Sequence, residues 1–316
     1  MTDKKIIAVF GATGAQGGGL VRAILRDAAS EFAVRAITRN PDSDKARELA
    51  RLGAEVVQAD LDDPQSLRRA LQGAYGAFCV TFFWDHFSPE RELAEARHLA
   101  EAAKEAQVQH VIWSTLEDVR QWVPLDDDRM PTLHGRYKVP HTDAKGEADQ
   151  YFRDLGVPTT FLLTSFYWEN LIHFGMGPQP AADGSLAVVF PMGDKRLSSI
   201  AAEDIGRCAY GIFKKGTALI GQTVGVAGEQ LTWHDMAASL SRALGREVRY
   251  HAVEPAAYRQ FGFPGAEDLG NMFQANRDFE QHYVGARDVA FSRELNPELL
   301  TFDAWLTQNA ARLPMA

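Results

Sequence analysis

The segment 6–18, IIAVFGATGAQGG, constrains the fold most, because an apolar run ends at a glycine-rich turn and passes directly into the helix-like stretch LVRAILRD. Gly11 permits a tight turn after the strand, and Gly14 lets a ligand's phosphates approach the backbone. Gly17 or Gly18 lets the helix pack on the strand, and the helix N-terminus attracts anions. Strand, turn and helix in this order predict a dinucleotide-binding site, whereas a glycine pattern alone would not.

Strands and helices alternate through the first half of the chain. Gly53 stands where a helix is expected to end, and Asp63 followed by Pro64 is typical of a helix start. The alternation predicts an α/β fold with a Rossmann-type doubly wound parallel sheet and a second, smaller α/β domain. We expect strands at 5–10, 33–38, 55–59, 76–82 and 109–114, and helices at 17–28, 44–52, 64–72 and 89–106.

The end of the second expected strand selects between the two nicotinamide dinucleotides. Arg39 stands where an NAD site usually carries an acidic residue for the ribose hydroxyls. A guanidinium suits a 2′-phosphate, and charged hydrogen bonds of about 1.5–3 kcal/mol correspond to roughly a ten- to hundredfold preference. The sequence therefore predicts NADP(H) as the cofactor.

The alternation weakens after residue 157. We assign 1–157 and about 195–220 to an NADP(H)-binding Rossmann domain, and about 158–194 and 221–316 to a smaller substrate or partner domain. The expected elements of this second half are strands at 159–164 and 247–252, a hairpin over 185–200, and helices at 202–214, 232–244, 255–261, 265–281 and 301–310.

Ligands of doubly wound sheets bind at the carboxyl ends of the strands, which directs attention to the residues after each strand. There, Asp60 can accept a hydrogen bond from the adenine amino group, while Thr81 can line the ribose and nicotinamide. Phe82 and Phe83 suit the same role or an ordinary core position equally well.

A helix is expected over 140–155, and it places His141 and Lys145 four residues apart on one face. In short-chain dehydrogenases a proton-donating tyrosine precedes a lysine by four residues, with a serine at the end of the fifth strand. Ser114 and Lys145 match this arrangement, but His141 replaces the tyrosine. Loss of a general acid lowers a rate by about 10²–10⁴. Two interpretations stay open for each residue. His141, with its shorter side chain, either donates the proton in place of the tyrosine or faces solvent. Ser114 either takes part in catalysis or only forms hydrogen bonds with the backbone.

Six segments together resemble the NmrA-like family of atypical short-chain dehydrogenases/reductases, nearest its HSCARG-type NADPH-sensing branch: FGATGAQGG, TRNP after the second strand, GAEVVQAD, HTDAKGEADQYFRDLGVP, FYWEN at 166–170 and FGFPGAEDLGNMF at 261–273. The resemblance implies NADP(H) binding and, in several members, regulation through protein contacts. The cofactor contacts expected from the motifs and the resemblance are Gly11, Thr13, Gly14, Ala15, Gln16, Gly17, Arg39, Asp60, Leu61, Thr81, Phe82, Phe83, Lys145, Tyr167, Trp168 and Asn170.

Composition excludes several classes of protein. A formal charge of −9 without any Lys/Arg-rich run argues against nucleic acid as a partner, and the apolar stretches are shorter than the ~20 residues of a membrane span. We expect a cytoplasmic protein whose two cysteines, Cys79 and Cys208, are buried. The nine histidines lack metal-ligand spacing, so no metal site is predicted. The acidic loop Asp126–Asp128 has no assigned role.

Two functions stay open at this point. One is an NADP(H)-binding redox sensor or regulator with weak or no dehydrogenase activity, acting on a protein partner. The other is an NADPH-dependent reductase of quinones, dyes or other small apolar acceptors, with the proton supplied by His141 or water. The sequence identifies neither the acceptor nor the partner, and it leaves a homodimer open.

Overall fold

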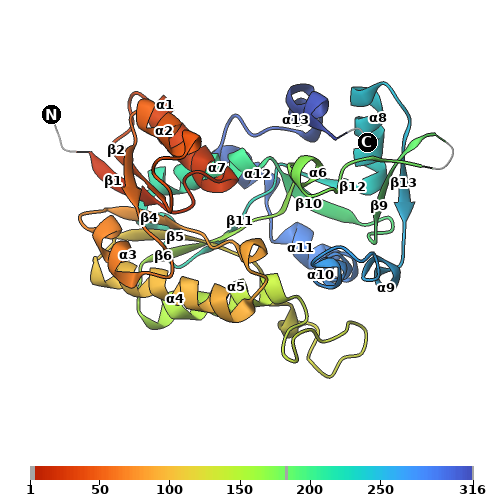
Figure 1. The fold of residues 1–316 in the computed structure, drawn as a ribbon, viewed down its shortest axis with the longest axis horizontal. Coiled ribbons are helices and arrows are strands. Elements are labelled where there is room, and N and C mark those ends of the chain that lie inside the picture. Colours follow the sequence, from red (N-terminus) through yellow and green to blue (C-terminus); the bar gives the residue numbers. More distant parts are fainter. Residues whose placement is uncertain (1–3, 182–183, 315–316) are drawn as a thin grey trace.

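The computed structural model describes residues 4–181 and 184–314, and its central feature is a sheet of seven parallel strands in the spatial order β11-β6-β5-β4-β1-β2-β3 (Figure 1). The order reverses at β1, which pairs with β2 on one side and β4 on the other. This is the predicted doubly wound α/β arrangement. The strands are β1 (Lys5–Val9), β2 (Phe32–Thr38), β3 (Glu55–Gln58), β4 (Gly76–Cys79), β5 (His110–Thr115), β6 (Thr159–Leu163) and β11 (Thr223–Gly225).

Helices cover both faces of this sheet (Figure 1). Along β1, Ile7 and Val9 point into the core under one layer, while Ala8 points into the other, because strand side chains alternate. A sheet buried on both faces is typical of parallel strands. One layer contains α1 (Ala15–Arg26), α2 (Asp44–Arg51), α7 (Ala202–Lys214) and α12 (Val289–Leu295), and the other α3 (Pro64–Leu71), α4 (Pro89–Glu105) and α5 (Pro140–Asp154).

The remainder forms two three-stranded sheets, β12-β10-β7 and β13-β9-β8, around an aromatic core. The rings of Phe190 and Trp233 stack at its centre with centroids 3.6 Å apart. The elements are β7 (Phe166–Tyr167), β8 (Gln179–Pro180), β9 (Leu186–Phe190), β10 (Arg196–Ile200), β12 (Glu229–Thr232), β13 (Val248–Ala252), α6 (Asn170–His173), α8 (Trp233–Leu244), α9 (Pro255–Tyr258), α10 (Ala266–Asp278), α11 (Glu280–Gly285) and α13 (Phe302–Asn309).

Local signals at helix ends are confirmed. The Asp63 side chain accepts a hydrogen bond from the N–H of Gln65, and Pro64 is the first residue of α3. Gly53 follows α2 with φ +107°, a conformation that L side chains rarely adopt. These positions were predictable because the interactions involve neighbours in the chain.

The prediction of a hairpin over 185–200 is wrong. β9 and β10 belong to different sheets, since β9 lies between β8 and β13 whereas β10 lies between β7 and β12. The single helix expected over 265–281 is two helices, α10 and α11, which meet at Phe279. Neither β11 nor α12 was predicted, because each is short and gains its stability from packing on distant residues.

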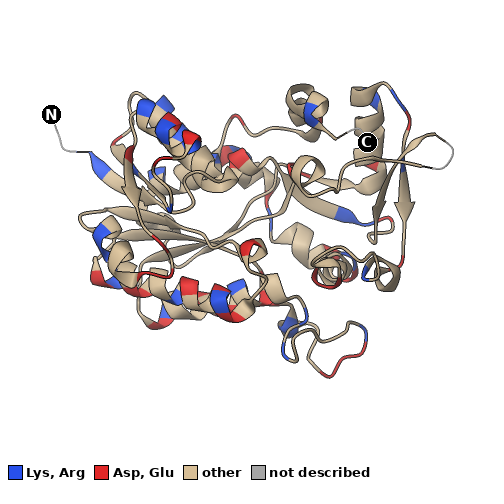
Figure 2. Cartoon of the chain, viewed as in Figure 1, with Lys and Arg blue, Asp and Glu red and all other residues tan. Residues whose placement is uncertain are grey.

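Strand pairing also bears on the domain division, which stays a prediction. β6 and β11 pair within the large sheet although both follow residue 157. We propose that the large unit takes in β6, β11 and α12 in addition to its expected ranges. Acidic and basic residues are interspersed along α2 and α4 (Figure 2). Among the described helices, none has the length and apolar character needed to cross a bilayer.

Candidate functional site

A cavity of about 670 Å³ lies along the carboxyl ends of the strands of the large sheet. Its far side is lined by the smaller unit, by which we mean the two three-stranded sheets and the helices packed around them. Both units contribute residues to its wall, which places the cavity at the edge where doubly wound sheets bind ligands. The structure gathers nearly all of the predicted site residues there: Gly11, Thr13, Gly14, Ala15, Gln16, Gly17, Arg39, Asp60, Leu61, Thr81, Phe82, Phe83, Ser114, His141, Lys145, Tyr167 and Asn170.

The glycine turn forms one end of the cavity. Gly11 has φ +62°, and a Cβ added to Gly17 would lie 2.5 Å from the Gly11 carbonyl oxygen, so Gly17 is the residue that lets the helix pack closely. Helix α1 begins at Ala15, two residues earlier than expected, with Gly14 as its N-cap. Its first turn carries no acidic residue, and its first N–H groups have no acceptor within the helix. This cradle fits an anion such as a pyrophosphate.

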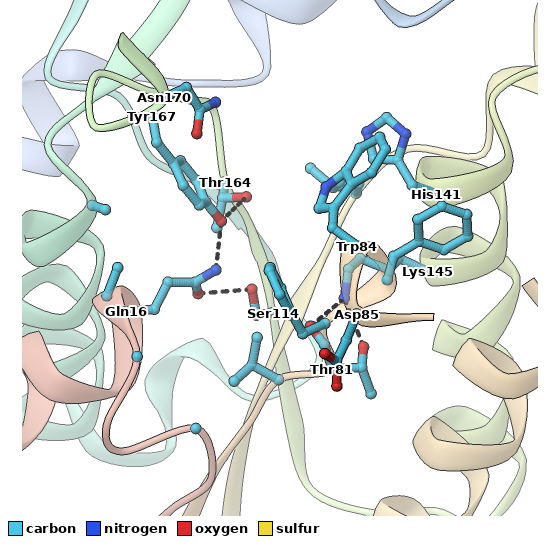
Figure 3. A pocket seen from close by; sticks show the side chains of 18 of the residues that line it. Gln16, Thr81, Trp84, Asp85, Ser114, His141, Lys145, Thr164, Tyr167 and Asn170 are labelled. Atoms are coloured by element: carbon cyan, nitrogen blue, oxygen red, sulfur yellow. Dashed lines mark hydrogen bonds between the residues drawn. The ribbon is translucent and has the colours of Figure 1, made fainter. Parts of the chain in front are cut away.

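A chain of hydrogen bonds joins three predicted residues across the cavity (Figure 3). The Ser114 hydroxyl donates to Gln16 Oε1 at 2.9 Å, and Gln16 Nε2 donates to the Tyr167 hydroxyl at 2.5 Å. These side chains come from β5, α1 and β7, which links the large sheet to the smaller unit. Burial raises the pKa of Tyr167, so its hydroxyl keeps its proton.

Arg39 lies at the carboxyl end of β2 and is largely exposed. Its Nη1 donates to Asp85 Oδ2 at 3.0 Å. Asp85 closes a 3-10 turn, Phe83–Asp85, that follows β4. The position of Arg39 agrees with the prediction, but its pairing with a carboxylate 46 residues away was not predicted.

Lys145 is buried and held by two groups, of which Figure 3 shows Thr81. Its Nζ lies 2.6 Å from the Thr81 hydroxyl and 2.6 Å from Glu92 Oε1. Glu92 is fully buried on α4 and also accepts a hydrogen bond from the Thr81 hydroxyl. Burial alone would raise the pKa of Glu92, but Lys145, His86 and Thr81 hold it at about 2. Glu92 is therefore the permanent counter-charge of Lys145.

Within the described residues, one cluster has metal-ligand character: His86, Glu92 and Glu95 place a ligand atom each within 4.8 Å of one another. The backbone N–H of Ser88 donates to His86 Nδ1 at 3.0 Å. In the neutral ring the proton must then lie on Nε2, which faces Glu92 Oε2 at 3.6 Å. A protonated Nε2 has no lone pair for a metal, so this arrangement of the cluster does not favour metal binding.

His141, the residue in the tyrosine position, is bound to Asp268 of α10. Asp268 Oδ1 lies 2.5 Å from His141 Nδ1, and Asp268 Oδ2 accepts the backbone N–H of His141 at 3.1 Å. This carboxylate fixes a proton on Nδ1 and leaves Nε2 as the nitrogen that can give or take one. The ring packs against Trp84, centroid to centroid 4.8 Å, on the cavity wall opposite Tyr167 (Figure 3). The alternative of a solvent-facing His141 is wrong, because the side chain is buried.

The two neighbouring phenylalanines have different environments. Phe82 is 55% exposed, whereas Phe83 is buried against Trp84 and His141. Further apolar side chains complete the far end of the cavity, namely Trp84, Phe87, Phe166, Phe174, Met176, Phe263, Leu269 and Met272. This end therefore suits a flat or apolar molecule.

Trp168 is the predicted cofactor contact that does not line the cavity. Its side chain is fully buried in the core of the smaller unit, where Nε1 donates to the Ser199 hydroxyl at 2.8 Å. Trp168 follows β7, and its backbone N–H donates to the Ile200 carbonyl while its ring packs against Phe302 and Trp305, which holds the side chain in the core.

Arg287 and Glu117 form a buried pair in the cavity wall. Arg287 Nη1 and Nη2 donate to the two Glu117 carboxylate oxygens at 2.6 and 3.0 Å, and Nη2 also donates to the Thr164 carbonyl at 2.6 Å. The pair ties the end of β5 to the segment after α11 and to β6. It was not predicted, since 170 residues separate the partners.

The important residues that sequence reasoning missed are Glu92, Asp268, Asp85 and Arg287. Glu92 and Asp268 lie within amphipathic helices, where a carboxylate normally faces solvent. Only Asp85 had a usable signal, because it closely follows a strand of the large sheet.

Comparison with known proteins agrees with this architecture. A model of the NmrA-like family matches residues 3–306. The chain belongs to the NmrA-like family. The predicted family is thus confirmed, whereas its HSCARG-type branch stays a prediction. A family relative, the NmrA-like family domain-containing oxidoreductase ptmS of Penicillium ochrochloron, is 28% identical over 342 residues, which cover 98% of each protein.

Solved structures of this NmrA-like architecture include both regulators and enzymes. NmrA, a negative transcriptional regulator solved in complex with NAD and with NADP, is 26% identical, with a TM-score of 0.78 over 96% of this chain and 95% of that chain. The Citrobacter sp. triphenylmethane reductase complexed with NADP(H) is 20% identical, with a TM-score of 0.75 over 96% and 99%, and shares the fold. Family membership alone therefore does not choose between the two functions.

Proposed function

We propose that this chain is an NADP(H)-dependent reductase of flat, apolar acceptors such as quinones or dyes. The observation that carries the proposal is one continuous cavity with the glycine turn at one end and an aromatic wall at the other. The His141–Asp268 pair lies on that aromatic wall. The aromatic wall suits an acceptor beside a dinucleotide, and a purely cofactor-sensing site does not need such a wall.

The residues of the cradle fit the dinucleotide. The N–H groups of Ala15, Gln16 and Gly17 would hold the pyrophosphate, since no described side chain caps the N-terminus of α1. Arg39 would face the adenosine 2′-phosphate, and NmrA, solved with NAD and with NADP, supports a nicotinamide dinucleotide at this place. Lys145 would contact the nicotinamide ribose with Glu92 balancing its charge. When bound in reduced form, a nicotinamide supplies a hydride.

His141 is the group that we propose holds the proton for the acceptor. Asp268 orients its ring, and the tilted ring of Trp84 packs against it with centroids 4.8 Å apart. A quinone-like acceptor needs little help from an acid, whereas an aldehyde needs more. Dependence on His141 should therefore grow from quinones to aldehydes.

The decisive test is NADPH consumption with a panel of quinones, triphenylmethane dyes and aldehydes. The proposal expects turnover in the parent protein, and a fall of about 10²-fold in kcat for aldehydes in His141→Asn, with cofactor affinity retained. Asp268→Asn should reproduce part of that loss and shift the pH profile of kcat. Tight NADPH binding without turnover of any acceptor would reject the reductase.

A regulator is the second candidate, favoured by the replacement of the tyrosine by His141 and by the similarity to NmrA. In this role dinucleotide occupancy would alter the contact between the two units through Gln16 and Tyr167. Small-angle scattering of the protein with and without NADPH tests it. An unchanged profile and oligomeric state, together with turnover, would eliminate this candidate.

A further inference from the structure

The ribose 2′ end of the cavity carries two opposite charges, and this bears on cofactor choice. Arg39 Nη1 and Asp85 Oδ2 are 3.0 Å apart, and both residues line the cavity. From the proposed binding of a nicotinamide dinucleotide, on which this inference rests, we infer that Asp85 is a specificity residue that lowers the preference for NADP(H) over NAD(H).

The other cations of the cavity wall are not available for such a role. Lys145 and Arg287 are paired with the buried carboxylates of Glu92 and Glu117. Arg91, also at the wall, is paired with two carboxylates, the exposed one of Asp62 and that of Glu95, whose side chain is 7% exposed. Among the described lysines and arginines that line the cavity, Arg39 differs because its carboxylate partner is exposed and no buried carboxylate pairs with it, with side-chain exposures of 65% for Arg39 and 47% for Asp85. An exposed pair is weak and can exchange partners.

Asp85 is nevertheless held in a defined position. Its N–H donates to the Phe82 carbonyl at 3.1 Å, and the N–H of Phe87 donates to the Phe83 carbonyl at 2.8 Å. Phe83 is buried and anchors the turn against His141. The Asp85 carboxylate is therefore presented by a structured turn, so its effect on a ligand is a property of the site.

The two cofactors differ in what they offer this pair. A 2′-phosphate brings negative charge that Arg39 attracts and Asp85 repels, so it must displace the carboxylate from the guanidinium. The 2′-hydroxyl of NAD can donate a hydrogen bond to the same carboxylate, as an acidic residue does in NAD sites. Asp85 thus weakens the binding of NADP(H) and strengthens the binding of NAD(H).

The test is the dissociation constant of NADP⁺ and of NAD⁺, measured by calorimetry for the parent protein, Asp85→Asn and Arg39→Gln. We expect Asp85→Asn to tighten NADP⁺ about fivefold and weaken NAD⁺ about threefold. Arg39→Gln should weaken NADP⁺ roughly ten- to a hundredfold and leave NAD⁺ within about twofold. Raising the salt concentration should reduce these differences.

A matched control is Glu31→Gln, which removes the same charge from an exposed ion pair with Lys5 at the opposite end of β1. It should leave both constants unchanged, and circular dichroism should show all variants folded. Equal shifts of both dinucleotides in Asp85→Asn, or no shift, would overturn the inference while leaving the proposed function standing. A parent protein that binds neither dinucleotide would instead reject the proposed function itself.

Discussion

The two ends of the cavity are built in opposite ways. The cradle end comes from one continuous segment, in which Gly11 and Gly17 are six residues apart and touch through the turn. The aromatic end comes from side chains scattered along the chain, and its polar pairs span 127 residues for His141–Asp268 and 170 for Arg287–Glu117.

This difference explains how each end fails. A substitution in the local turn causes steric overlap with residues nearby in the chain, so it should mainly weaken ligand binding. The end assembled from distant residues depends on the packing of the two units, so a substitution there should mainly lower the free energy of unfolding. The predictions below test that contrast in order of decreasing effect.

The largest loss of stability is expected from Arg287→Met. It leaves the Glu117 carboxylate buried without its cation, which costs about 3–5 kcal/mol. Urea unfolding followed by circular dichroism measures the change. Arg242→Met is the control, because its pair with Asp303 is more than 60% exposed on both sides and is worth about 0–1 kcal/mol. Similar losses of stability in both variants would contradict the proposed difference between the two ends of the cavity.

Asp149 lies on α5, the helix that contributes to both ends of the cavity, and its titration offers a test of stability. Its Oδ1 accepts hydrogen bonds from Trp113 Nε1 and from the Thr115 hydroxyl, and burial raises its pKa to about 7. The unfolded carboxyl releases its proton near its usual value of 3.8, so between that pH and about 7 the folded state binds more protons and stability falls as pH rises. At about 1.4 kcal/mol per pKa unit, the fall amounts to a few kcal/mol.

Asp149→Asn should remove that part of the pH dependence, because the amide oxygen still accepts both bonds without titrating. Chemical denaturation at several pH values between 4 and 7.5 measures it. The exposed Asp154→Asn, on the same helix, serves as the control and should follow the parent curve. Parallel curves for all three proteins would contradict the assignment.

At the cradle end, Gly17→Ala should weaken dinucleotide binding at least about tenfold and cost about 1–3 kcal/mol of stability. The added Cβ would lie 2.5 Å from the Gly11 carbonyl oxygen and push the turn out of shape. Calorimetric titration and thermal unfolding measure the two effects. Gly285→Ala is the control, since a Cβ there meets nothing within 4 Å and alanine favours the helix. Unchanged binding in Gly17→Ala would mean that the cradle is not the binding site.

The smallest effect on the cavity is expected from Trp168→Phe. The indole lies in the core of the smaller unit, so the dinucleotide dissociation constant should change less than about twofold. Stability should fall by about 1–2 kcal/mol through loss of the hydrogen bond to Ser199. Tyr167→Phe, one residue earlier and on the cavity wall, should change binding more. The reverse order would restore Trp168 as a cofactor contact.

The sequence by itself determined the doubly wound sheet, the glycine cradle and the position of Arg39, Ser114 and Lys145 at strand and helix ends. Each of these depends on a few neighbouring residues or on a hydrophobic period, which a chain carries locally. The same locality explains why the confirmed helix signals, such as Asp63 and Pro64, could be recognised.

Only the tertiary structure decided which side chains meet. It separated β9 from β10, turned Trp168 into the core, and paired Lys145 with Glu92 and His141 with Asp268. A buried carboxylate in an amphipathic helix has no signature of its own, because its cost is offset by a partner that is distant in sequence. The acidic loop is a further case: Lys138 is buried beneath it and donates to the carbonyls of Leu125, Asp127 and Met130.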